Sequence, residues 1–328
     1  LEALHRGARG SARRASIQSV PTLEPAQGEA VDATTLLEVI DWHVHRQPDR
    51  IQVIYISESG EQPITCRDLA QASERVAAGL QHRGLEAGQS VAVMLPTCPE
   101  YFPVYLGILL AGGIPVPIYP PAHLAQVEEH VRRHVGILCN ARAVLLVTIP
   151  EARAVAWLLQ VHVPCLRKVV SAQELLQSRE CLTRVPVAAQ DVAFIQYTSG
   201  STGDPKGVVL THANLLANIR AMGQAIGLRP DDVFVSWLPL YHDMGLIGAW
   251  LGTLYFGIPL AVMSPLAFLA RPVRWLQAIH AYRGTLSAAP NFAYELCVKK
   301  IGDEELVGLD LSSWRLAFNG AETVLPET

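Results

Sequence analysis

Residues 197–207 have the sequence Tyr197-Thr198-Ser199-Gly200-Ser201-Thr202-Gly203-Asp204-Pro205-Lys206-Gly207. The apolar run 192–196 in front of this stretch predicts a buried strand, and the apolar run 208–210 after it predicts a second, shorter strand. We therefore expect a loop rich in glycine, serine and threonine, held between two strands and carrying a single lysine.

The composition of this loop suits a phosphate group. Gly200, Gly203 and Gly207 allow positive φ angles and a close approach between the backbone and a ligand. Successive N–H groups in such a turn can form a nest for an anion. Lys206 adds a compact positive charge on a flexible stem. Four hydroxyl side chains add further hydrogen-bond donors: Thr198, Ser199, Ser201 and Thr202.

Two other nucleotide-binding motifs do not match this loop. A Walker A loop needs Gly-Lys followed by Ser or Thr at the start of a helix, whereas Lys206 is followed by Gly207 and an expected strand. The loop contains no G-x-G-x-x-G fingerprint either. A flexible surface loop would have a similar composition, so the residues alone leave that alternative open.

Residues 197–207 resemble the phosphate-binding motif of adenylate-forming enzymes. These enzymes include acyl-CoA synthetases, fatty acyl-AMP ligases, nonribosomal peptide adenylation domains and luciferases. The resemblance implies that Thr198, Ser199, Gly200, Ser201, Thr202, Gly203, Lys206 and Gly207 bind the phosphates of ATP. It also implies that Lys206 takes part in catalysis.

Length and composition indicate a protein with a large core. The chain has 328 residues, of which 50% are hydrophobic and 17% charged, with a net charge of −4. A nucleic-acid partner would need a basic patch, so we expect none. The cysteines form no C-x-x-C pair, which fits reduced thiols in a cytoplasmic protein and argues against a disulfide framework or zinc site. No metal-ligating residue can be assigned.

Two stretches without charged residues, 101–127 and 244–270, are long enough to suggest membrane spans. Proline and glycine interrupt both of them, and a helix followed by a buried strand explains each one better. We therefore expect no membrane span, and a helix over residues 244–256.

Strands and helices alternate along most of the chain, which predicts βαβ units and an α/β fold with mostly parallel sheets. Residues 1–30 contain several arginines among Gly, Ser and Ala residues, and we expect this segment to be a disordered tail or linker. We assign residues 31–190 to a first α/β subdomain and 191–328 to a second one, which carries the phosphate loop. The resemblance implies two stacked αβα subdomains, as in the large N-terminal domain of adenylate-forming enzymes.

A second informative stretch, residues 237–248, runs Trp237-Leu238-Pro239-Leu240-Tyr241-His242-Asp243-Met244-Gly245-Leu246-Ile247-Gly248. A histidine at a strand end is often only a hydrogen-bonded structural residue. The stretch, however, resembles the aromatic-His motif of adenylate-forming enzymes, in the form found in fatty acyl-AMP ligases. This implies that His242 is catalytic and lies by the reacting carboxylate. It also implies an acyl pocket lined by Trp237, Tyr241, His242, Gly245 and Gly248, although close helix packing would also explain the two glycines.

A third stretch, Phe318-Asn319-Gly320-Ala321-Glu322, follows an expected strand, at the end where ligands bind open α/β sheets. Gly320 and Ala321 are small enough for a flat base to lie against the backbone. An ordinary strand-to-helix turn is the alternative. By resemblance to acyl-AMP ligases, the adenine-binding residues are Asn319, Gly320, Ala321 and Glu322.

Taken together, the resemblance implies ATP-dependent activation of a fatty acid to acyl-AMP, with release of pyrophosphate and with ATP and Mg²⁺ as cofactors. The acyl group would then pass to the phosphopantetheine thiol of an acyl carrier protein. Two alternatives stay open: a long-chain acyl-CoA synthetase that uses CoA, and a non-catalytic lipid- or nucleotide-binding domain of a larger protein.

Three features of the family have no counterpart in the chain: the aromatic-Gly-x-Thr-Glu motif, the ribose-binding Asp and the small C-terminal domain with its mobile lysine. We therefore expect these residues to be the larger N-terminal part of the enzyme, working with its own missing C-terminal domain. We expect the 328 residues alone to turn over poorly or not at all. The sequence does not determine the acyl chain length, the acceptor or the oligomeric state.

Overall fold

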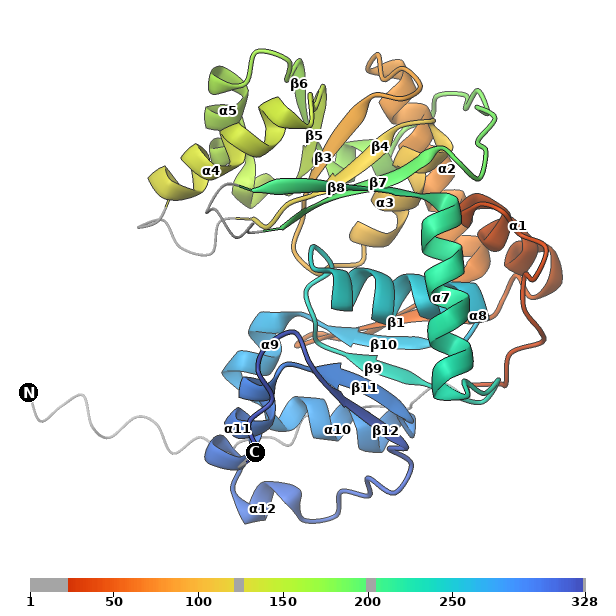
Figure 1. Ribbon diagram of the computed structural model, residues 1–328, viewed down its shortest axis with the longest axis vertical. Helices are drawn as coiled ribbons and strands as arrows, with labels where there is room; N and C mark the ends of the chain where they lie inside the picture. Colours follow the sequence, from red (N-terminus) through yellow and green to blue (C-terminus); the bar gives the residue numbers. More distant parts are fainter. Residues whose placement is uncertain (1–22, 121–126, 199–204, 327–328) are drawn as a thin grey trace, which may run out of the picture.

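The computed structural model describes residues 23–120, 127–198 and 205–326. It shows two α/β layers stacked along the long axis of the molecule (Figure 1). One layer contains a four-stranded sheet and a two-stranded hairpin, and the other contains a six-stranded sheet. This arrangement confirms the predicted α/β fold with mostly parallel sheets.

The four-stranded sheet is entirely parallel, and its strands are joined by helices, as the alternation predicts. Its strands in sheet order are β4 (Ile114–Pro117), β3 (Ser90–Met94), β5 (Leu145–Thr148) and β6 (Lys168–Ser171). The connecting helices are α3 (Tyr101–Leu110), α4 (Val127–Asn140) and α5 (Arg153–His162), and α6 (Ala172–Leu176) follows β6. A short 3-10 helix, η2 (Pro150–Ala152), precedes α5.

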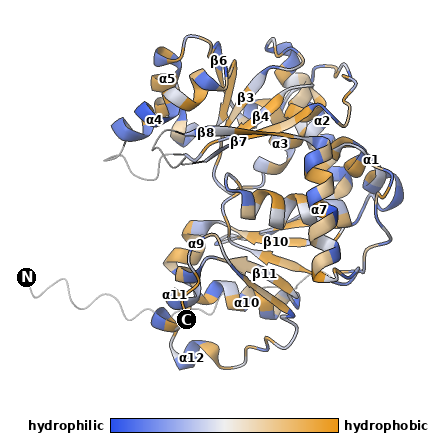
Figure 2. Ribbon diagram, in the orientation of Figure 1, coloured by the Kyte–Doolittle hydropathy of each residue, from blue (hydrophilic) through white to orange (hydrophobic). Residues whose placement is uncertain are grey.

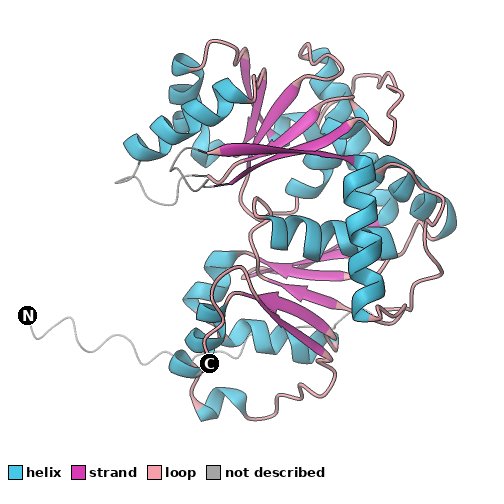
Figure 3. Cartoon of the chain, in the orientation of Figure 1, coloured by secondary structure: helices cyan, strands magenta, loops and turns pink. Residues whose placement is uncertain are grey.

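Both faces of the four-stranded sheet are covered by helices (Figure 3). Along β3, Val91 and Val93 belong to the core shared with α3, whereas Ala92 and Met94 belong to a second core with α4 and α5. This alternation follows from the two-residue period of a strand. Because both faces are buried, the strand is apolar at nearly every position, as is typical of parallel sheets (Figure 2).

The six-stranded sheet has five parallel strands and one antiparallel edge strand. Its strands in sheet order are β12 (Leu316–Asn319), β11 (Leu286–Ala289), β9 (Phe234–Ser236), β10 (Leu260–Met263), β1 (Ile51–Ser57) and β2 (Gly60–Thr65). The remaining helices of the two layers are α1 (Leu36–Arg46), α2 (Cys66–His82), η3 (Met244–Leu251), α8 (Gly252–Phe256), α9 (Pro265–Ala270), α10 (Val273–Tyr282), α11 (Asn291–Lys300) and α12 (Asp303–Leu306).

The predicted strand, loop and strand around the phosphate motif form an antiparallel hairpin, β7 (Val192–Thr198) and β8 (Lys206–Thr211). The second strand starts at Lys206, two residues earlier than the apolar pattern predicts. Thr198 and Lys206 are register partners at the end of the hairpin where the phosphate motif connects its two strands. Helix α7 (His212–Ile226) follows, and the Thr211 hydroxyl accepts a hydrogen bond from the Asn214 N–H at its start.

Strands from both sides of residue 190 share the six-stranded sheet, so the sheets do not separate at the predicted boundary between residues 190 and 191. Strand β1 pairs with β10, with Val53 opposite Leu260. The hairpin of β7 and β8 lies instead beside β4 in the other layer (Figure 1). Local sequence predicts where a strand lies in the chain but carries little information about its partner in the sheet.

One apolar cluster joins the two layers. Its centre is an aromatic group in which the Trp250 ring lies edge-on to the rings of Tyr101, Phe102 and Tyr105. All four side chains are fully buried. Within the described ranges, no helix is both long enough and apolar enough to cross a membrane. All six cysteines are free thiols.

Candidate functional site

Two of the three predicted motifs lie at one edge of the six-stranded sheet. Strands β9, β11 and β12 are parallel neighbours, so their carboxyl ends meet at the same edge. Trp237 follows β9, Asn291 lies two residues after β11, and Asn319 ends β12. Since neighbouring strands lie about 4.8 Å apart, β9 and β12 are separated by roughly 10 Å. Ligands of open α/β sheets bind at this edge.

Trp237 contributes an aromatic wall to this edge. Its side chain is 3% exposed. Its ring stacks on Phe268 at a centroid distance of 4.0 Å and meets the edge of Phe292 at 6.1 Å. Flat aromatic surfaces of this kind line the pockets that bind apolar ligands.

His242 and Asp243 form a charged pair beside this wall. The His242 Nδ1 and Asp243 Oδ1 atoms lie 2.7 Å apart, and both side chains are more than half exposed. The hydrogen bond with Asp243 raises the pKa of His242 above its ordinary value, and it lowers the pKa of Asp243. The arrangement therefore favours an imidazolium, which suits a neighbouring anionic group.

The pair of His242 and Asp243 predicts how its stabilisation of the fold depends on pH. Because the folded pKa of His242 is raised, the stabilisation by the charged pair is fully present below about 6.5 and is lost as the pH rises through the folded pKa. We expect Asp243→Asn to remove the raising effect, so that the His242 titration midpoint falls to 6.5 or below. Histidine NMR titration measures both midpoints. An unchanged midpoint in the variant would show that Asp243 does not set the charge of His242.

The predicted helix over residues 244–256 is confirmed, but its first part is not an α-helix. Met244–Leu251 winds as a π-helix, η3, and only Gly252–Phe256 is an α-helix. The π-helical part is almost entirely apolar, so its sequence lacks the polar face that marks an amphipathic α-helix. π-Helical turns occur mainly at functional sites, and this one directly follows His242 and Asp243.

The two glycines of this helix differ in their surroundings. A Cβ at Gly245 would overlap the carbonyl oxygen of Pro239, so close packing explains this glycine. A Cβ at Gly248 would meet no atom within 4 Å. Close packing therefore does not explain why residue 248 is a glycine. The place of Gly248 in an acyl pocket stays a proposal.

Alanine substitutions at these glycines should separate the two cases. We expect Gly245→Ala to lower the free energy of unfolding by about 1–3 kcal/mol, because the Pro239 backbone must move. We expect Gly248→Ala to be neutral or to stabilise the helix by up to about 1 kcal/mol. Urea unfolding of the two variants measures the difference, and equal losses would contradict this view of the glycines.

Hydrogen bonds connect the phosphate hairpin to the second motif. Gln196 in β7 donates from Nε2 to the Tyr241 carbonyl oxygen at 3.1 Å. The buried Tyr101 hydroxyl donates to the preceding carbonyl, that of Leu240, at 2.7 Å. The Tyr241 ring also lies 6.1 Å from the ring of Tyr119. The loop that carries His242 follows β9 of the six-stranded sheet and is thus held against the layer of the four-stranded sheet and the hairpin.

The phosphate motif itself is described only at its two ends. Ser199, Gly200, Ser201, Thr202 and Gly203 lie outside the described residues. Thr198, Lys206 and Gly207 are exposed. A Cβ at Gly207 would lie 3.0 Å from side-chain atoms of both Ile195 and Tyr197, so the hairpin has little room for a larger residue there. Within the described residues, no hydrogen bond or ion pair joins Lys206 to His242 or to residues 319–322.

The residues predicted to bind adenine form a hydrogen-bonded turn after β12. The Asn319 Nδ2 atom donates to Asn291 Oδ1 at 3.0 Å, and Gly320 N donates to the Ala289 carbonyl oxygen at 3.3 Å. Glu322 Oε1 accepts from Phe292 N at 2.6 Å. Ala321 has φ +68°, a left-handed conformation that is uncommon for residues with a side chain. Since the Phe292 ring also contacts Trp237, this residue links the second and third motifs.

Four residues around the site were not predicted: Tyr119, Gln196, Asn291 and Phe292. Asn291 had a usable signal, because it follows a short buried strand just as the predicted motifs do. Gln196 lies within the predicted strand in front of the phosphate loop. Neither Tyr119 nor Phe292 belongs to a sequence pattern that distinguishes it from core aromatic residues.

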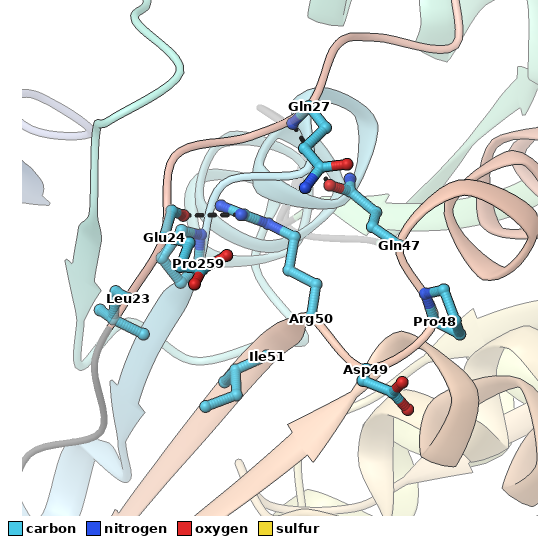
Figure 4. A pocket seen from close by; sticks show the side chains of 9 residues that line it. All are labelled: Leu23, Glu24, Gln27, Gln47, Pro48, Asp49, Arg50, Ile51 and Pro259. Atoms are coloured by element: carbon cyan, nitrogen blue, oxygen red, sulfur yellow. Dashed lines mark hydrogen bonds between the residues drawn. The ribbon is translucent and has the colours of Figure 1, made fainter.

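Two pockets in the described part of the chain lie away from these motifs. One, of about 390 Å³, lies where β1 and β10 begin, at the opposite edge of the six-stranded sheet (Figure 4). Arg50 extends across it and donates to the Glu24 carbonyl oxygen at 2.6 Å and the Gly257 carbonyl oxygen at 2.5 Å. The other, of about 440 Å³, lies beside the start of β4 and β7. No residue of the three motifs lines either pocket.

Known proteins provide an independent comparison. The family model described as AMP-binding enzyme matches residues 40–328. Two medium-chain-fatty-acid–[acyl-carrier-protein] ligases are 33% identical to the chain: JamA of Moorena producens, over 302 residues, and TtuA of Teredinibacter turnerae, over 332 residues. The matches cover 90% and 89% of this chain but only 50% and 51% of the relatives, so the chain spans about half of their length.

Solved structures agree with this result. The fatty acyl-adenylate ligase from Legionella pneumophila, in complex with acyl adenylate and pyrophosphate, superposes with a TM-score of 0.81 at 34% identity. The match covers 92% of this chain and 52% of that one. The family match extends over most of the chain and includes all three motifs, as the resemblance predicts. The chain therefore belongs to the family of AMP-binding enzymes.

Proposed function

We propose that the chain forms the nucleotide- and fatty-acid-binding part of a fatty acyl-AMP ligase. The observation that carries this proposal is the shared edge of the six-stranded sheet. There, the aromatic wall at Trp237 follows β9, and the turn 319–322 follows β12, with only β11 between these two strands. The favoured imidazolium at His242 lies five residues after Trp237. These three surfaces suit an apolar acyl chain, a flat base and a carboxylate, respectively.

In this proposal, a carboxylate oxygen of the fatty acid attacks the α-phosphorus of ATP. The bond from that phosphorus to the oxygen bridging to the β-phosphate breaks, and pyrophosphate leaves. The imidazolium of His242 holds the carboxylate, while Trp237, Tyr241 and Gly248 line the start of the acyl chain. Lys206 and the hydroxyl-rich loop 198–203 hold the phosphates, mainly by position and charge. The adenine lies against residues 319–322.

ATP would enter as its magnesium complex, which supplies further positive charge to the phosphates. The described residues contain no group of three or more His, Cys, Asp or Glu side chains that could hold a metal ion. The carboxylates within the second and third motifs are those of Asp243 and Glu322, and both already accept hydrogen bonds from described residues.

We further propose that the acceptor is the phosphopantetheine thiol of an acyl carrier protein. Relatives at 33% identity are named medium-chain-fatty-acid–[acyl-carrier-protein] ligases, and they support this acceptor and a fatty acid of medium length. The six free thiols support a cytoplasmic location, because disulfides are rare in reducing compartments.

The test is product analysis by mass spectrometry, on the longest protein that contains these 328 residues. We expect acyl-AMP from ATP and a fatty acid, followed by an acyl thioester on a phosphopantetheinylated carrier protein. Transfer to CoA instead would replace the acceptor part of the proposal with an acyl-CoA synthetase. ATP or fatty-acid binding without any acyl-AMP would indicate a non-catalytic binding domain.

A further inference from the structure

Asn291 lies at the start of α11, two residues after β11 ends, and its side chain is 2% exposed. Its Oδ1 atom accepts from the backbone N–H of Leu325 at 3.2 Å and from Asn319 Nδ2 at 3.0 Å. Its Nδ2 atom donates to Glu295 Oε1 at 3.3 Å. A single buried amide thus contacts both the end of β12 and the segment that follows it.

These contacts determine which way the Asn291 amide faces. A backbone N–H can only donate, so the atom facing Leu325 must be the oxygen. An ionised carboxylate can only accept, so the atom facing Glu295 must be the nitrogen. Both ends of the amide are therefore specified by partners that allow one orientation only.

The orientation of Asn291 in turn determines that of Asn319. Because Asn291 presents an oxygen, Asn319 must turn its NH₂ group toward it. The Asn319 side-chain oxygen is then directed away from Asn291. Within the described part of the chain, this oxygen is buried and has no hydrogen-bond partner. A buried acceptor without a donor is unfavourable, so a ligand that brings an N–H group to this position would be bound in preference to one that brings an oxygen.

We propose that Asn291 is a positioning residue that makes Asn319 a hydrogen-bond acceptor and so selects the base of the nucleotide. Adenine carries an amino group at its 6 position, which is a donor. Hypoxanthine and guanine carry an oxygen there, which would face the Asn319 oxygen. Binding requires the exposed residues 321–324, which form neither helix nor strand, to yield to the base, while Leu325 N and Glu295 keep their contacts with Asn291. The inference rests on the proposed function, in that residues 319–322 line the base.

The test compares the dissociation constants of ATP and of inosine triphosphate, in which an oxygen replaces the 6-amino group and N1 carries a hydrogen. Binding is measured by calorimetry on this chain and on the longest protein that contains it. We expect the unaltered protein to prefer ATP by about tenfold or more. In Asn291→Ala, where the Asn319 amide is free to turn, we expect the preference to fall to about threefold or less. Asn291→Asp combined with Glu295→Gln keeps the acceptor toward Asn319 without setting two carboxylates against each other, and should retain most of the preference.

Tyr294→Phe is the matched control, because it removes a hydrogen bond of 2.7 Å from the Tyr294 hydroxyl to the Phe318 carbonyl oxygen without touching the Asn319 amide. It should leave the ratio of the two constants unchanged. Equal affinities for the two nucleotides in the unaltered protein would overturn the inference without any variant having to fold, and would leave ATP binding intact. Binding of neither nucleotide would instead contradict the proposed function, and with it this inference.

Discussion

Replacing Lys206 with alanine is expected to lower the rate of acyl-AMP formation by about 100-fold or more. Lys206 is exposed at the end of the hairpin, opposite Thr198. Its side chain makes no hydrogen bond or ion pair to the other residues that the structure describes, so its charge is available for a ligand. Removing one well-placed group that stabilises developing negative charge typically costs a factor of 10² to 10³. The rate is measured as acyl-AMP released under saturating ATP.

The same substitution should leave the fold intact, because exposed side chains without partners usually change stability by less than about 0.5 kcal/mol. Lys300→Ala is a matched control, since it removes the same charge from an exposed lysine at the end of α11. We expect the control to retain full activity. A Lys206→Ala variant that stays within about threefold of the unaltered rate would exclude a role for this lysine in phosphate binding.

The second large effect is on stability. Asp232 and Arg315 form an ion pair of 2.6 Å in which the Asp232 side chain is 2% exposed and the Arg315 side chain 21%. Asp232 Oδ2 also accepts from Arg229 N at 2.8 Å. Asp232→Ala would leave a largely buried guanidinium without its counter-charge. We expect it to lower the free energy of unfolding by about 3–5 kcal/mol.

Urea unfolding measures this loss, with Asp49→Ala as the control. Asp49 pairs with Arg67 at 3.1 Å, but its side chain is 82% exposed, so its removal should cost less than about 1 kcal/mol. Because Arg315 immediately precedes β12, the Asp232 variant should also weaken nucleotide binding at Asn319. Equal losses in the two variants would show that burial does not set the strength of the Asp232 pair.

Much of the fold could be predicted because local signals were strong. The alternation of apolar strands and helices predicted the parallel sheets. The pairing of β1 with β10 could not be predicted, since nothing in residues 51–57 specifies a partner two hundred residues away. The π-helix after Asp243 was missed because its sequence is almost entirely apolar.

The candidate site, like the fold, could be predicted only in part from the sequence. The motif residues could be proposed from the sequence because each motif ends or follows a strand and has a distinctive composition. Asn291 also follows a strand, but it was missed because the residues around it have no distinctive composition. Its importance depends on hydrogen bonds to residues 28 and 34 positions later. Gly245 and Gly248 are indistinguishable in sequence, and only the position of the Pro239 carbonyl separates them.

The proposed function is tested most directly by the exchange of labelled pyrophosphate into ATP, which reports reversible formation of an acyl adenylate whatever the acceptor. The assay is run on the longest protein that contains these 328 residues, with fatty acids of increasing length and with Lys206→Ala beside the unaltered protein. We predict exchange that requires a fatty acid and falls about 100-fold in the variant. A folded protein that binds ATP but shows no exchange with any carboxylic acid would contradict the proposed function.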